Sequence, residues 1–309
     1  MDIFLATLSQ MTTFFIFMAI GYIFKKISIL PDNSGTVLSR LLLYVFLPAL
    51  SFNTFSKNLT QDTVADKLPF LLASLVMLAV TFALALGLAR LFSSNKNTQA
   101  VFVYAFTIPN LGYVGYPLVE QIFGTQTLLD YMIFCLPLNI FIYTVGMYIL
   151  NPKREMNLKK LLNPSIIAIL LGSAVGLLGW QLPTVVTSTL SAAASCMGPV
   201  AMLLSGFVLA RDPMKEMLCS GRMYVAALIR LIVMPALVGA ALYFLGVDPY
   251  IGVLACCALA LPMGLNNIVF PEAFGGDSKT GAQSCFVSNV LGLITVPIAY
   301  MIVAAVFGG

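Results

Sequence analysis

Two long hydrophobic segments of this chain are each interrupted near the middle by a proline. The first covers residues 101–123 and breaks at Pro109-Asn110, and the second covers residues 251–274 and breaks at Pro262. A helix surrounded by lipid must satisfy its own backbone polar groups, so an interruption at mid-depth is tolerated only where it lines a cavity in the protein. Two such interruptions at corresponding positions of two halves indicate the binding site of a secondary transporter.

The composition is that of a membrane protein. Hydrophobic residues make up 60% of the 309 residues, charged residues make up 9%, and the mean hydropathy is +0.98. Soluble domains carry about 25% charged residues, so most of this surface does not face water. The first apolar stretch, residues 3–24, has no basic residue before it and no small-residue cleavage site after it. We therefore interpret it as a membrane span and not as a signal peptide.

Ten apolar runs are long enough to cross the ~30 Å hydrocarbon core of a bilayer. The sequence therefore predicts an all-α polytopic membrane protein with ten transmembrane helices, of which the fourth and the ninth are broken. The predicted spans are approximately 3–24, 37–55, 68–92, 100–123, 128–150, 164–180, 188–210, 223–246, 250–275 and 283–307.

The basic residues predict how these spans are oriented, because Lys and Arg favour cytoplasmic connections. Alternate connections carry thirteen Lys and Arg residues on one side and only Lys57 and Lys67 on the other. We therefore expect a multi-pass protein of the cell (plasma) membrane with both termini extracellular or periplasmic, and a cytoplasmic connection at 151–163. The thirteen residues are Lys25, Lys26, Arg40, Arg90, Lys96, Lys153, Arg154, Lys159, Lys160, Arg211, Lys215, Arg222 and Lys279.

Equal spacings between landmarks in the two halves predict an internal duplication. Ten spans divide into two five-helix repeats, residues 1–150 and 164–309, joined by the connection 151–163. Because five is odd, the second repeat must be inverted in the membrane relative to the first. Pro48 and Pro199 are 151 residues apart, and a constant offset of this kind marks a repeat. Phe123-Gly124 and Phe274-Gly275 are also 151 apart, and Asn139 and Asn289 are 150 apart.

The residues around the two breaks resemble the crossing motifs of the auxin efflux carrier family. The first motif is Pro109-Asn-Leu-Gly-Tyr-Val-Gly-Tyr-Pro117, followed by Phe123-Gly124. The second is Pro262-Met-Gly-Leu-Asn266-Asn267, followed by Phe274-Gly-Gly-Asp277 and by Ser288-Asn289-Val-Leu-Gly. The resemblance extends over the whole chain, including its length and its ten-span layout. The long cytoplasmic loop of the plant carriers is absent, which favours a bacterial or archaeal permease.

The resemblance implies a fold with two inverted repeats and crossed, broken helices, as in sodium/proton antiporters and bile acid transporters. Spans 1, 2, 6 and 7 would form a scaffold, and spans 3–5 and 8–10 would form a moving transport domain, in an elevator-type mechanism. It also implies a homodimer formed through the scaffold. Family substrates include malate, malonate and auxin-like weak acids. An extra asparagine and Glu272 depart from the family pattern, which leaves the coupling ion, Na⁺ or H⁺, open.

Each break would place a half-helix N-terminus near the middle of the membrane, where free backbone amides and the helix dipole attract an anion. We expect these amides at Asn110, Leu111 and Gly112 in the first half and at residues 263–265 in the second. Asparagine side chains beside the breaks can orient carboxylate oxygens, or they can cap the broken helices. We favour ligand or ion contact for Asn110 and Asn266 because polar side chains in a bilayer are costly, and we hold the alternatives equal for Asn267. The substrate-binding candidates are Pro109, Asn110, Leu111, Gly112, Pro262, Asn266 and Asn267, with Asn139 and Asn289 as cavity-lining or interhelical residues.

Three charged residues are candidates for ion coupling. Glu120 and Glu272 follow the breaks by 11 and 10 residues. They can carry a proton or sodium ion, or they can be interfacial carboxylates at helix ends, and we favour the second alternative. Arg230 lies within the eighth span and can counter a substrate carboxylate, although an arginine there more commonly snorkels to the membrane surface.

Other classes of protein fit less well. The chain contains no histidine, which excludes Ser-His dyads and HExxH zinc sites, and it contains no P-loop for ATP. We therefore expect no enzyme activity, no metal, no cofactor and no nucleic-acid partner. The expected function is secondary transport of a small organic anion, a mono- or dicarboxylate, across the lipid bilayer. A channel and a membrane-embedded ligand sensor of the same fold are the alternatives.

Overall fold

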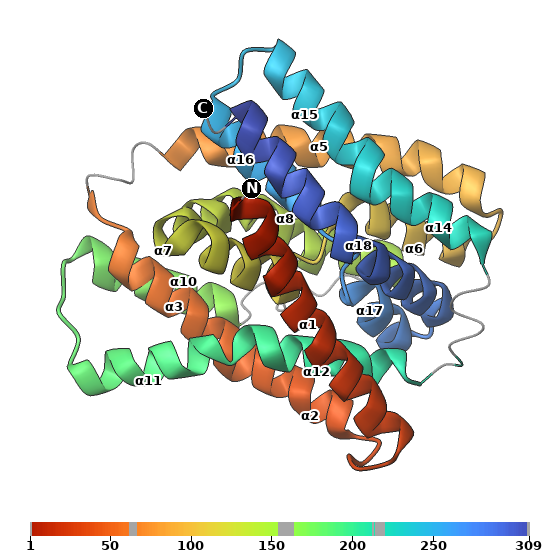
Figure 1. Ribbon diagram of the computed structural model, residues 1–309, viewed down its shortest axis with the longest axis horizontal. Coiled ribbons are helices and arrows are strands. Elements are labelled where there is room, and N and C mark those ends of the chain that lie inside the picture. The colour runs from red at the N-terminus through yellow and green to blue at the C-terminus, as the bar shows by residue number, and fades with distance from the viewer. Residues whose placement is uncertain (1, 62–66, 154–163, 212, 214–219, 308–309) are drawn as a thin grey trace.

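The computed structural model is built from helices packed side by side, as Figure 1 shows. It describes residues 2–61, 67–153, 164–211, 213 and 220–307. No β-strand is found within these ranges, and the expectation of an all-α fold is confirmed for them; a single antiparallel bridge joins Pro109 and Met263. Most of the predicted connection 151–163 lies outside the described residues.

The helices fall into two groups along the chain. Those before the central connection are α1 (Asp2–Lys26), α2 (Ser34–Leu41), η1 (Leu42–Phe46), α3 (Leu47–Asn58), α5 (Leu68–Phe92), α6 (Lys96–Thr107), η3 (Leu111–Gly115), α7 (Tyr116–Phe134), α8 (Leu136–Phe141), η4 (Ile142–Gly146) and α9 (Met147–Leu150). Those after it are α10 (Pro164–Leu177), α11 (Thr184–Ser195), α12 (Met197–Leu209), α14 (Gly221–Leu228), η6 (Ile229–Val233), α15 (Met234–Phe244), α16 (Pro249–Leu259), α17 (Asn266–Phe274) and α18 (Ser278–Phe307).

Six helical stretches in the described residues are long and apolar enough to cross a membrane, or seven if a pair bent by 47° is counted as one span. The bent pair is Leu111–Phe134 with Leu136–Leu150. Two further apolar helices, α10 and α16, are shorter. A polytopic membrane protein is thus supported, and the full count of ten spans stays a prediction. The six are Ile3–Lys26, Ser34–Asn58, Leu68–Phe92, Thr184–Leu209, Gly221–Phe244 and Ser278–Val306.

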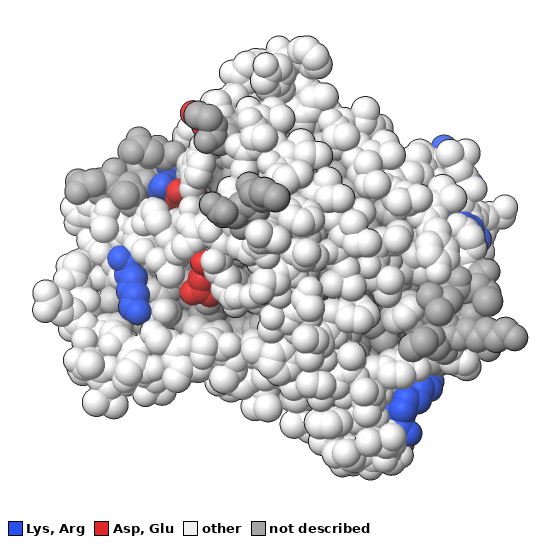
Figure 2. All heavy atoms as spheres, viewed as in Figure 1, with Lys and Arg blue, Asp and Glu red and all other residues white. Residues whose placement is uncertain are grey.

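The surface fits this class of protein. Large apolar side chains are exposed on many helices, including Val76 on α5 and Phe244 on α15, which are 64% and 85% exposed. The face in Figure 2 is mostly white, with Lys, Arg, Asp and Glu confined to a few places. An apolar surface of this extent is unfavourable in water but is the expected lipid-facing surface in a bilayer.

Prolines explain three of the wide π-helical turns that interrupt the helices. Pro48, Pro117 and Pro235 each lie just after such a turn, in η1, η3 and η6. The amide before each proline donates to the carbonyl five residues back. Proline has no N–H, and its ring clashes with the carbonyl four residues back, so a wider turn relieves the clash. Two of these turns lie next to the candidate site described below.

Glycines allow two helix pairs to pack closely. Gly21 of α1 and Gly206 of α12 face each other's helix backbone, and Gly172 and Gly176 of α10 contact backbone carbonyls of α3 and of Leu59, just beyond its end. The spacing of Gly172 and Gly176 is the GxxxG pattern, whose small residues allow helix backbones to approach closely. The structure shows this packing, because a side chain at either position would overlap the opposing backbone. These two pairs, α1 with α12 and α3 with α10, belong to predicted spans 1, 2, 6 and 7, and the role of these spans as a scaffold stays a prediction.

Gly206→Ala should destabilise the protein. A Cβ atom at this position would overlap the backbone carbonyl oxygen of Met18, so α1 and α12 would have to move apart. Overpacking of this kind costs about 1–3 kcal/mol, and thermal unfolding in detergent measures it as a lower Tm. Gly87→Ala on α5 is the matched control, because nothing lies within 4 Å of a Cβ built there. Equal Tm values for the two variants would contradict this account.

Polar contacts join the helices of the two predicted halves at opposite ends of the molecule. At one end, Asp130 forms an ion pair of 2.6 Å with Lys67 and accepts a hydrogen bond of 3.0 Å from the Tyr250 hydroxyl. At the other end, the Thr98 hydroxyl donates to Asp277 at 2.6 Å, and the Thr280 amide donates to the same carboxylate at 3.0 Å. The start of α16 is thereby joined to α7, and the start of α6 to α18.

Asp277→Asn should lower the Tm at neutral pH and have less effect in acid. Burial raises the pKa of Asp277, but hydrogen bonds from Thr98 and Thr280 and the nearby Arg222 charge outweigh burial and lower the pKa below its ordinary value of 3.8. The stability contributed by a carboxylate of lowered pKa is present above that ordinary value and is lost as the pH falls through the lowered one. The Tm difference from wild type, measured from pH 7 to below pH 4, should narrow at the acidic end. A difference independent of pH would contradict this role.

Candidate binding site at the broken helices

The two breaks predicted from the sequence lie against each other. The Asn110 amide donates a hydrogen bond of 2.8 Å to the Pro262 carbonyl, and Pro109 and Met263 form the antiparallel bridge. The Met263 amide donates to the Ser288 hydroxyl of α18 at 3.1 Å. Two segments separated by about half the chain therefore satisfy each other's backbone groups where both helices are open.

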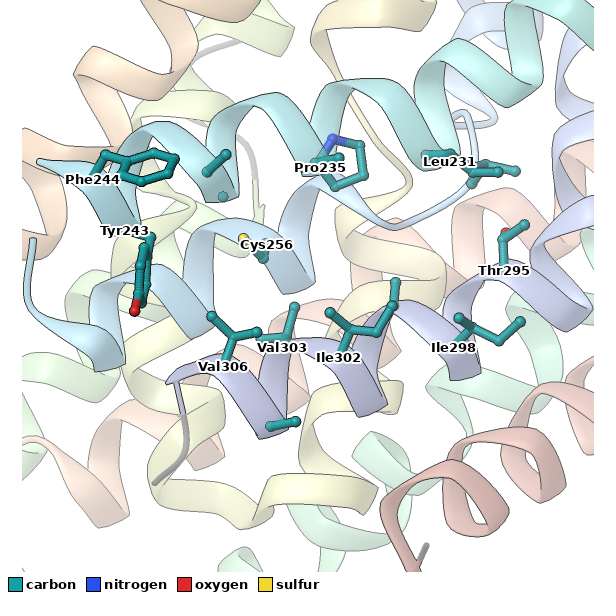
Figure 3. A pocket seen from close by; sticks show the side chains of 16 residues that line it. Leu231, Pro235, Tyr243, Phe244, Cys256, Thr295, Ile298, Ile302, Val303 and Val306 are labelled. Carbon is teal, nitrogen blue, oxygen red and sulfur yellow. The ribbon is translucent and has the colours of Figure 1, made fainter.

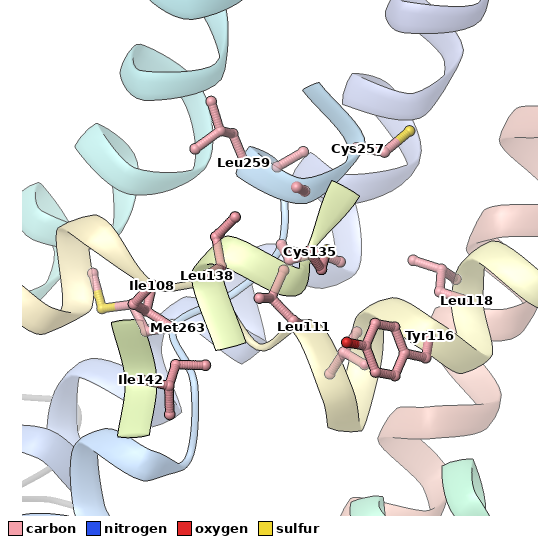
Figure 4. Close-up of a cluster of buried hydrophobic side chains, with 14 of the residues drawn as sticks. Ile108, Leu111, Tyr116, Leu118, Cys135, Leu138, Ile142, Cys257, Leu259 and Met263 are labelled. Atoms are coloured by element: carbon pink, nitrogen blue, oxygen red, sulfur yellow. The ribbon is translucent and has the colours of Figure 1, made fainter. Parts of the chain in front are cut away.

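Buried apolar side chains surround this crossing. Figure 4 shows Ile108 and Met263 close together there, with Leu111, Leu138 and Leu259 nearby, and all five are buried. Gly264 fits closely at the contact, because a Cβ there would lie 3.2 Å from the Pro109 carbonyl oxygen. The non-helical backbone is thus enclosed by protein and not by lipid, which is the condition for an interrupted membrane helix.

A cavity of about 220 Å³ opens on one side of the crossing. Both breaks line it, together with η4, α8, the η1–α3 helix and the first turns of α10. It is smaller than the 300–1,000 Å³ of drug-sized sites, so it suits a small ligand. No charged side chain lines it in the described part of the chain. Its polar lining residues are Asn110, Asn139, Asn266, Ser165, Tyr104, Tyr113, Tyr116 and Tyr143.

Asn110 lines the cavity and does not cap a helix. Its side chain makes no capping hydrogen bond to η3, and the buried Nδ2 atom has no hydrogen-bond partner in the described structure. The residue is only 3% exposed and lines the cavity. A buried N–H donor without an acceptor costs free energy, and a bound ligand with an acceptor oxygen would offset this cost.

The two asparagines of the second break have different surroundings. Asn266 is the first residue of α17 and lines the cavity. Asn267 is fully buried outside the cavity, where its Nδ2 donates to the Ser284 hydroxyl at 3.2 Å. Its Oδ1 has no partner among the described residues. Asn267 therefore contributes to the packing of α17 on α18 and does not line the cavity.

Fewer backbone amides are free than the sequence suggested. The amides of Asn110, Leu111 and Met263 were expected to face an anion, but all three donate within the protein, and that expectation was wrong. In particular, the Leu111 amide donates to the Pro109 carbonyl at 2.9 Å. Gly112 and Gly264 also line the cavity, one from each break. The Gly112 amide has no partner in the described part of the chain, whereas the Gly264 amide faces the Ile108 carbonyl across the antiparallel bridge of Pro109 and Met263.

Asn139 and Asn289 line different cavities. The Asn139 Nδ2 donates to the Tyr116 hydroxyl at 2.9 Å and to the Cys135 carbonyl at 3.0 Å, beside the 220 Å³ cavity. The Asn289 Nδ2 donates to the Cys285 carbonyl at 2.8 Å, beside a hole of about 10 Å³ between α1, α12, η3 and α18. The same hydrogen bond to a cysteine four residues back thus occurs at positions 150 residues apart.

Arg230 does not snorkel, which corrects the interpretation favoured from the sequence. The residue is fully buried in η6, and none of its three guanidinium nitrogens has a hydrogen-bond partner in the described structure. No acidic side chain pairs with it there.

Tyr131 lies close enough to Arg230 to interact electrostatically with it. Tyr131 packs edge-on against Tyr116, with ring centres 6.1 Å apart, and Tyr116 lines the cavity. Arg230 itself is absent from the cavity lining.

The two glutamates are not brought to the cavity. Glu120 is partly buried on α7 and is absent from the cavity lining. The side chain of Glu272 lies outside the described residues, although its backbone belongs to α17. Neither observation assigns an ion to these carboxylates, so their role in coupling stays a prediction.

The tyrosines of the site were not predicted from the sequence. Aromatic residues in apolar helices usually face lipid or core, but Tyr113 and Tyr116 line the cavity with Tyr104 and Tyr143. Ser165 of α10 lies there as well. The available signal was the position of Tyr113 and Tyr116 directly after the first break. The other three come from helices whose proximity only the packing determines.

Comparison with known proteins identifies the family. The model of the membrane transport protein family matches residues 6–160 and 154–300, which together cover nearly the whole chain. The chain belongs to this family. It is the auxin efflux carrier family, so the resemblance seen in the two crossing motifs is confirmed.

Relatives in this auxin efflux carrier family align over most of their length. The "Uncharacterized transporter YfdV" of Escherichia coli K12 is 25% identical over 311 residues, covering 93% of this chain and 97% of that protein. The "Uncharacterized transporter MJ1031" of Methanocaldococcus jannaschii is 22% identical over 292 residues, covering 91% and 94%. The "Putative malonate transporter" of Rhizobium meliloti is 25% identical over 298 residues, covering 92% and 91%. These names indicate a transporter and not an enzyme.

Proposed function

We propose that this family member is a secondary active transporter of a small organic anion, a mono- or dicarboxylate, bound where the two broken helices cross. The observation that carries the proposal is the unpartnered Asn110 Nδ2 in a small cavity lined by both breaks. The free amide of Gly112 adds a donor from the first half-helix. Donors of this kind, at helix N-termini and away from acidic side chains, favour a ligand with negatively charged oxygens.

Malonate, malate and auxin-like acids are the substrates to test first. The Rhizobium relative bears malonate in its name, and a short dicarboxylate suits a 220 Å³ cavity. The tyrosine hydroxyls add further groups that can donate to carboxylate oxygens. The buried Arg230 behind Tyr131 contributes a positive potential to the same region, because charges interact strongly where water is absent.

We place the site in an elevator-type transporter with ten helices in two inverted repeats, residues 1–150 and 164–309. Two observations favour this mechanism. The Asn139 and Asn289 hydrogen bonds match across the halves. The two cavities beside these asparagines differ in volume, about 220 Å³ against about 10 Å³. An asymmetry between two inverted halves is expected of alternating access, in which one side of the site is open while the other is closed. The scaffold would be spans 1, 2, 6 and 7.

The remaining features of the transporter are part of the same proposal. The protein lies in the plasma membrane with both termini outside, forms a homodimer through the scaffold, and couples transport to Na⁺ or H⁺. The ends of α1 and α5 and the start of α14 point toward the same side in Figure 1, and these ends carry basic residues. That common side would be cytoplasmic.

Uptake into liposomes tests the proposal. Purified protein is reconstituted, and uptake of malonate, malate, indole-3-acetate and a neutral amide analogue is followed with sodium and proton gradients imposed separately. Saturable uptake of an acid, driven by one gradient, is the expected result. Currents that rise without saturation would favour a channel. Saturable binding without flux would favour a sensor, and no binding of any acid would overturn the anion site.

A further inference from the structure

A second groove lies away from the crossing, where the end of α5 meets the start of α6. Its volume is about 200 Å³. Arg90 lies in the last turn of α5 and Lys96 is the first residue of α6, so both line the groove at its end next to the α5–α6 connection, and both residues are exposed. Neither residue has a hydrogen bond or ion pair with another side chain in the described ranges. Two basic side chains without protein partners therefore lie together at this end of the groove, which we call the basic mouth.

The rest of the groove is apolar. Ala100 and Val103 of α6 form part of the wall and are 7% exposed each, and Leu86 and Ile149 complete it. Gln99 also lines the groove, where its amide nitrogen donates to the Ser93 carbonyl at 2.7 Å. A free phosphate ion would use the basic mouth and would gain nothing from the apolar wall. A phospholipid matches both parts of the groove: its anionic headgroup can bind the two basic residues, and its acyl chain can pack against the apolar wall.

A groove at the corresponding place in the second half provides a comparison. It measures about 750 Å³ and lies between α15, α16 and α18, where Leu231, Cys256 and Ile302 face it in Figure 3. Ala89 and Ala240, which are 151 residues apart, each line one of the two grooves. No charged residue lines the larger groove in the part of the chain that is described. The basic mouth is therefore specific to one groove and is not a general property of the helix packing.

The geometry points to a binding site for an anionic phospholipid at this mouth, with the headgroup phosphate between Arg90 and Lys96 and the start of one acyl chain against Val103 and Ile149. The larger groove of the second half accepts acyl chains without preference for headgroup charge. The site lies between helices that the proposed mechanism assigns to the moving domain, so the lipid contacts the moving part of the protein. It is independent of the substrate and can be tested without knowing it.

Lipid-dependent thermal stability of the purified full chain tests the site. Dioleoyl phosphatidylglycerol should raise the Tm at lower concentration than dioleoyl phosphatidylcholine does. Arg90→Gln combined with Lys96→Gln should weaken the phosphatidylglycerol effect roughly thirtyfold, because each basic residue near an anionic headgroup contributes about a factor of five. Lys26→Gln combined with Arg40→Gln is the matched control, since it removes two basic residues from other helix ends. The control should respond to phosphatidylglycerol as the wild type does.

Two further ligands separate a lipid from a free anion. Inorganic phosphate and dihexanoyl phosphatidylglycerol should both stabilise less than the dioleoyl lipid, because neither fills the apolar wall. Equal stabilisation by phosphate would reduce the site to a simple anion site and overturn the lipid proposal. An equal loss in the Lys26/Arg40 control would show that overall surface charge is responsible, and it would overturn the site as well. An unchanged response of the Arg90/Lys96 variant would exclude the assigned residues.

Discussion

Asn110→Asp should abolish the uptake of every carboxylate that the wild-type protein takes up in liposomes. The substitution preserves the shape of the side chain and replaces the unpartnered Nδ2 donor by a carboxyl oxygen, which repels a bound carboxylate when it is ionised, in a cavity with no basic side chain among its described lining residues. The position is 3% exposed, so little water screens the repulsion between this charge and a bound anion.

Asn110→Ala separates the lost hydrogen bond from the added charge. A hydrogen bond to a charged ligand contributes about 1.5–3 kcal/mol, so uptake at low substrate concentration should fall roughly tenfold to a hundredfold. Initial rates over a range of malonate concentrations measure the effect. Asn53→Ala on α3 is the control, because Asn53 is absent from the cavity lining. Saturable uptake with unchanged KM in the aspartate variant would place the substrate elsewhere.

Arg230→Met should raise the thermal stability of the protein and at the same time abolish transport. A fully buried guanidinium with no hydrogen-bond partner in the described structure is destabilising, and an apolar residue of similar length removes that cost. Replacing buried charged groups by apolar residues has stabilised proteins by about 1–4 kcal/mol. Transport should be lost because the positive potential behind Tyr131 that favours an anion in the cavity would be absent.

Opposite changes in the two measurements distinguish this role from a structural one. Tm by thermal unfolding in detergent and uptake in liposomes are recorded for the same preparations. Arg230→Lys should restore part of the uptake, since it keeps the charge. A lower Tm for Arg230→Met with uptake reduced in proportion to the folded fraction would show that Arg230 supports the fold and does not act on the substrate.

The positions of the breaks were predictable because proline is incompatible with an uninterrupted helix. Pro109 and Pro262 lie in apolar runs where no water is available to satisfy freed backbone groups, so a cavity or a partner segment was required there. Close helix packing at Gly172 and Gly176 followed in the same way, since small residues at this spacing allow backbones to approach. Both features depend on local chemistry, which the sequence contains.

Side-chain orientation at the site was not predictable, because it depends on neighbours. Asn266 and Asn267 are adjacent, but one lines the cavity and the other is buried against Ser284, since successive residues of a helix point about 100° apart. The Asn110 and Met263 amides were expected to be free. Instead, the Asn110 amide donates to the Pro262 carbonyl of the opposing break, and the Met263 amide donates to the Ser288 hydroxyl of α18. The backbone amides at the breaks are thus paired with acceptors from another segment of the chain, and the sequence around each break does not specify these acceptors.

The sequence by itself determined the membrane class, the family and the two places where helices break, because these follow from apolar length, motif residues and the missing proline N–H. Only the tertiary structure decided that the breaks pair with each other, that tyrosines and Ser165 complete the cavity, and that Arg230 is buried and not snorkelling. The reason is that a helix specifies its own backbone hydrogen bonds, whereas burial and cavity lining arise from contacts between segments far apart in the chain.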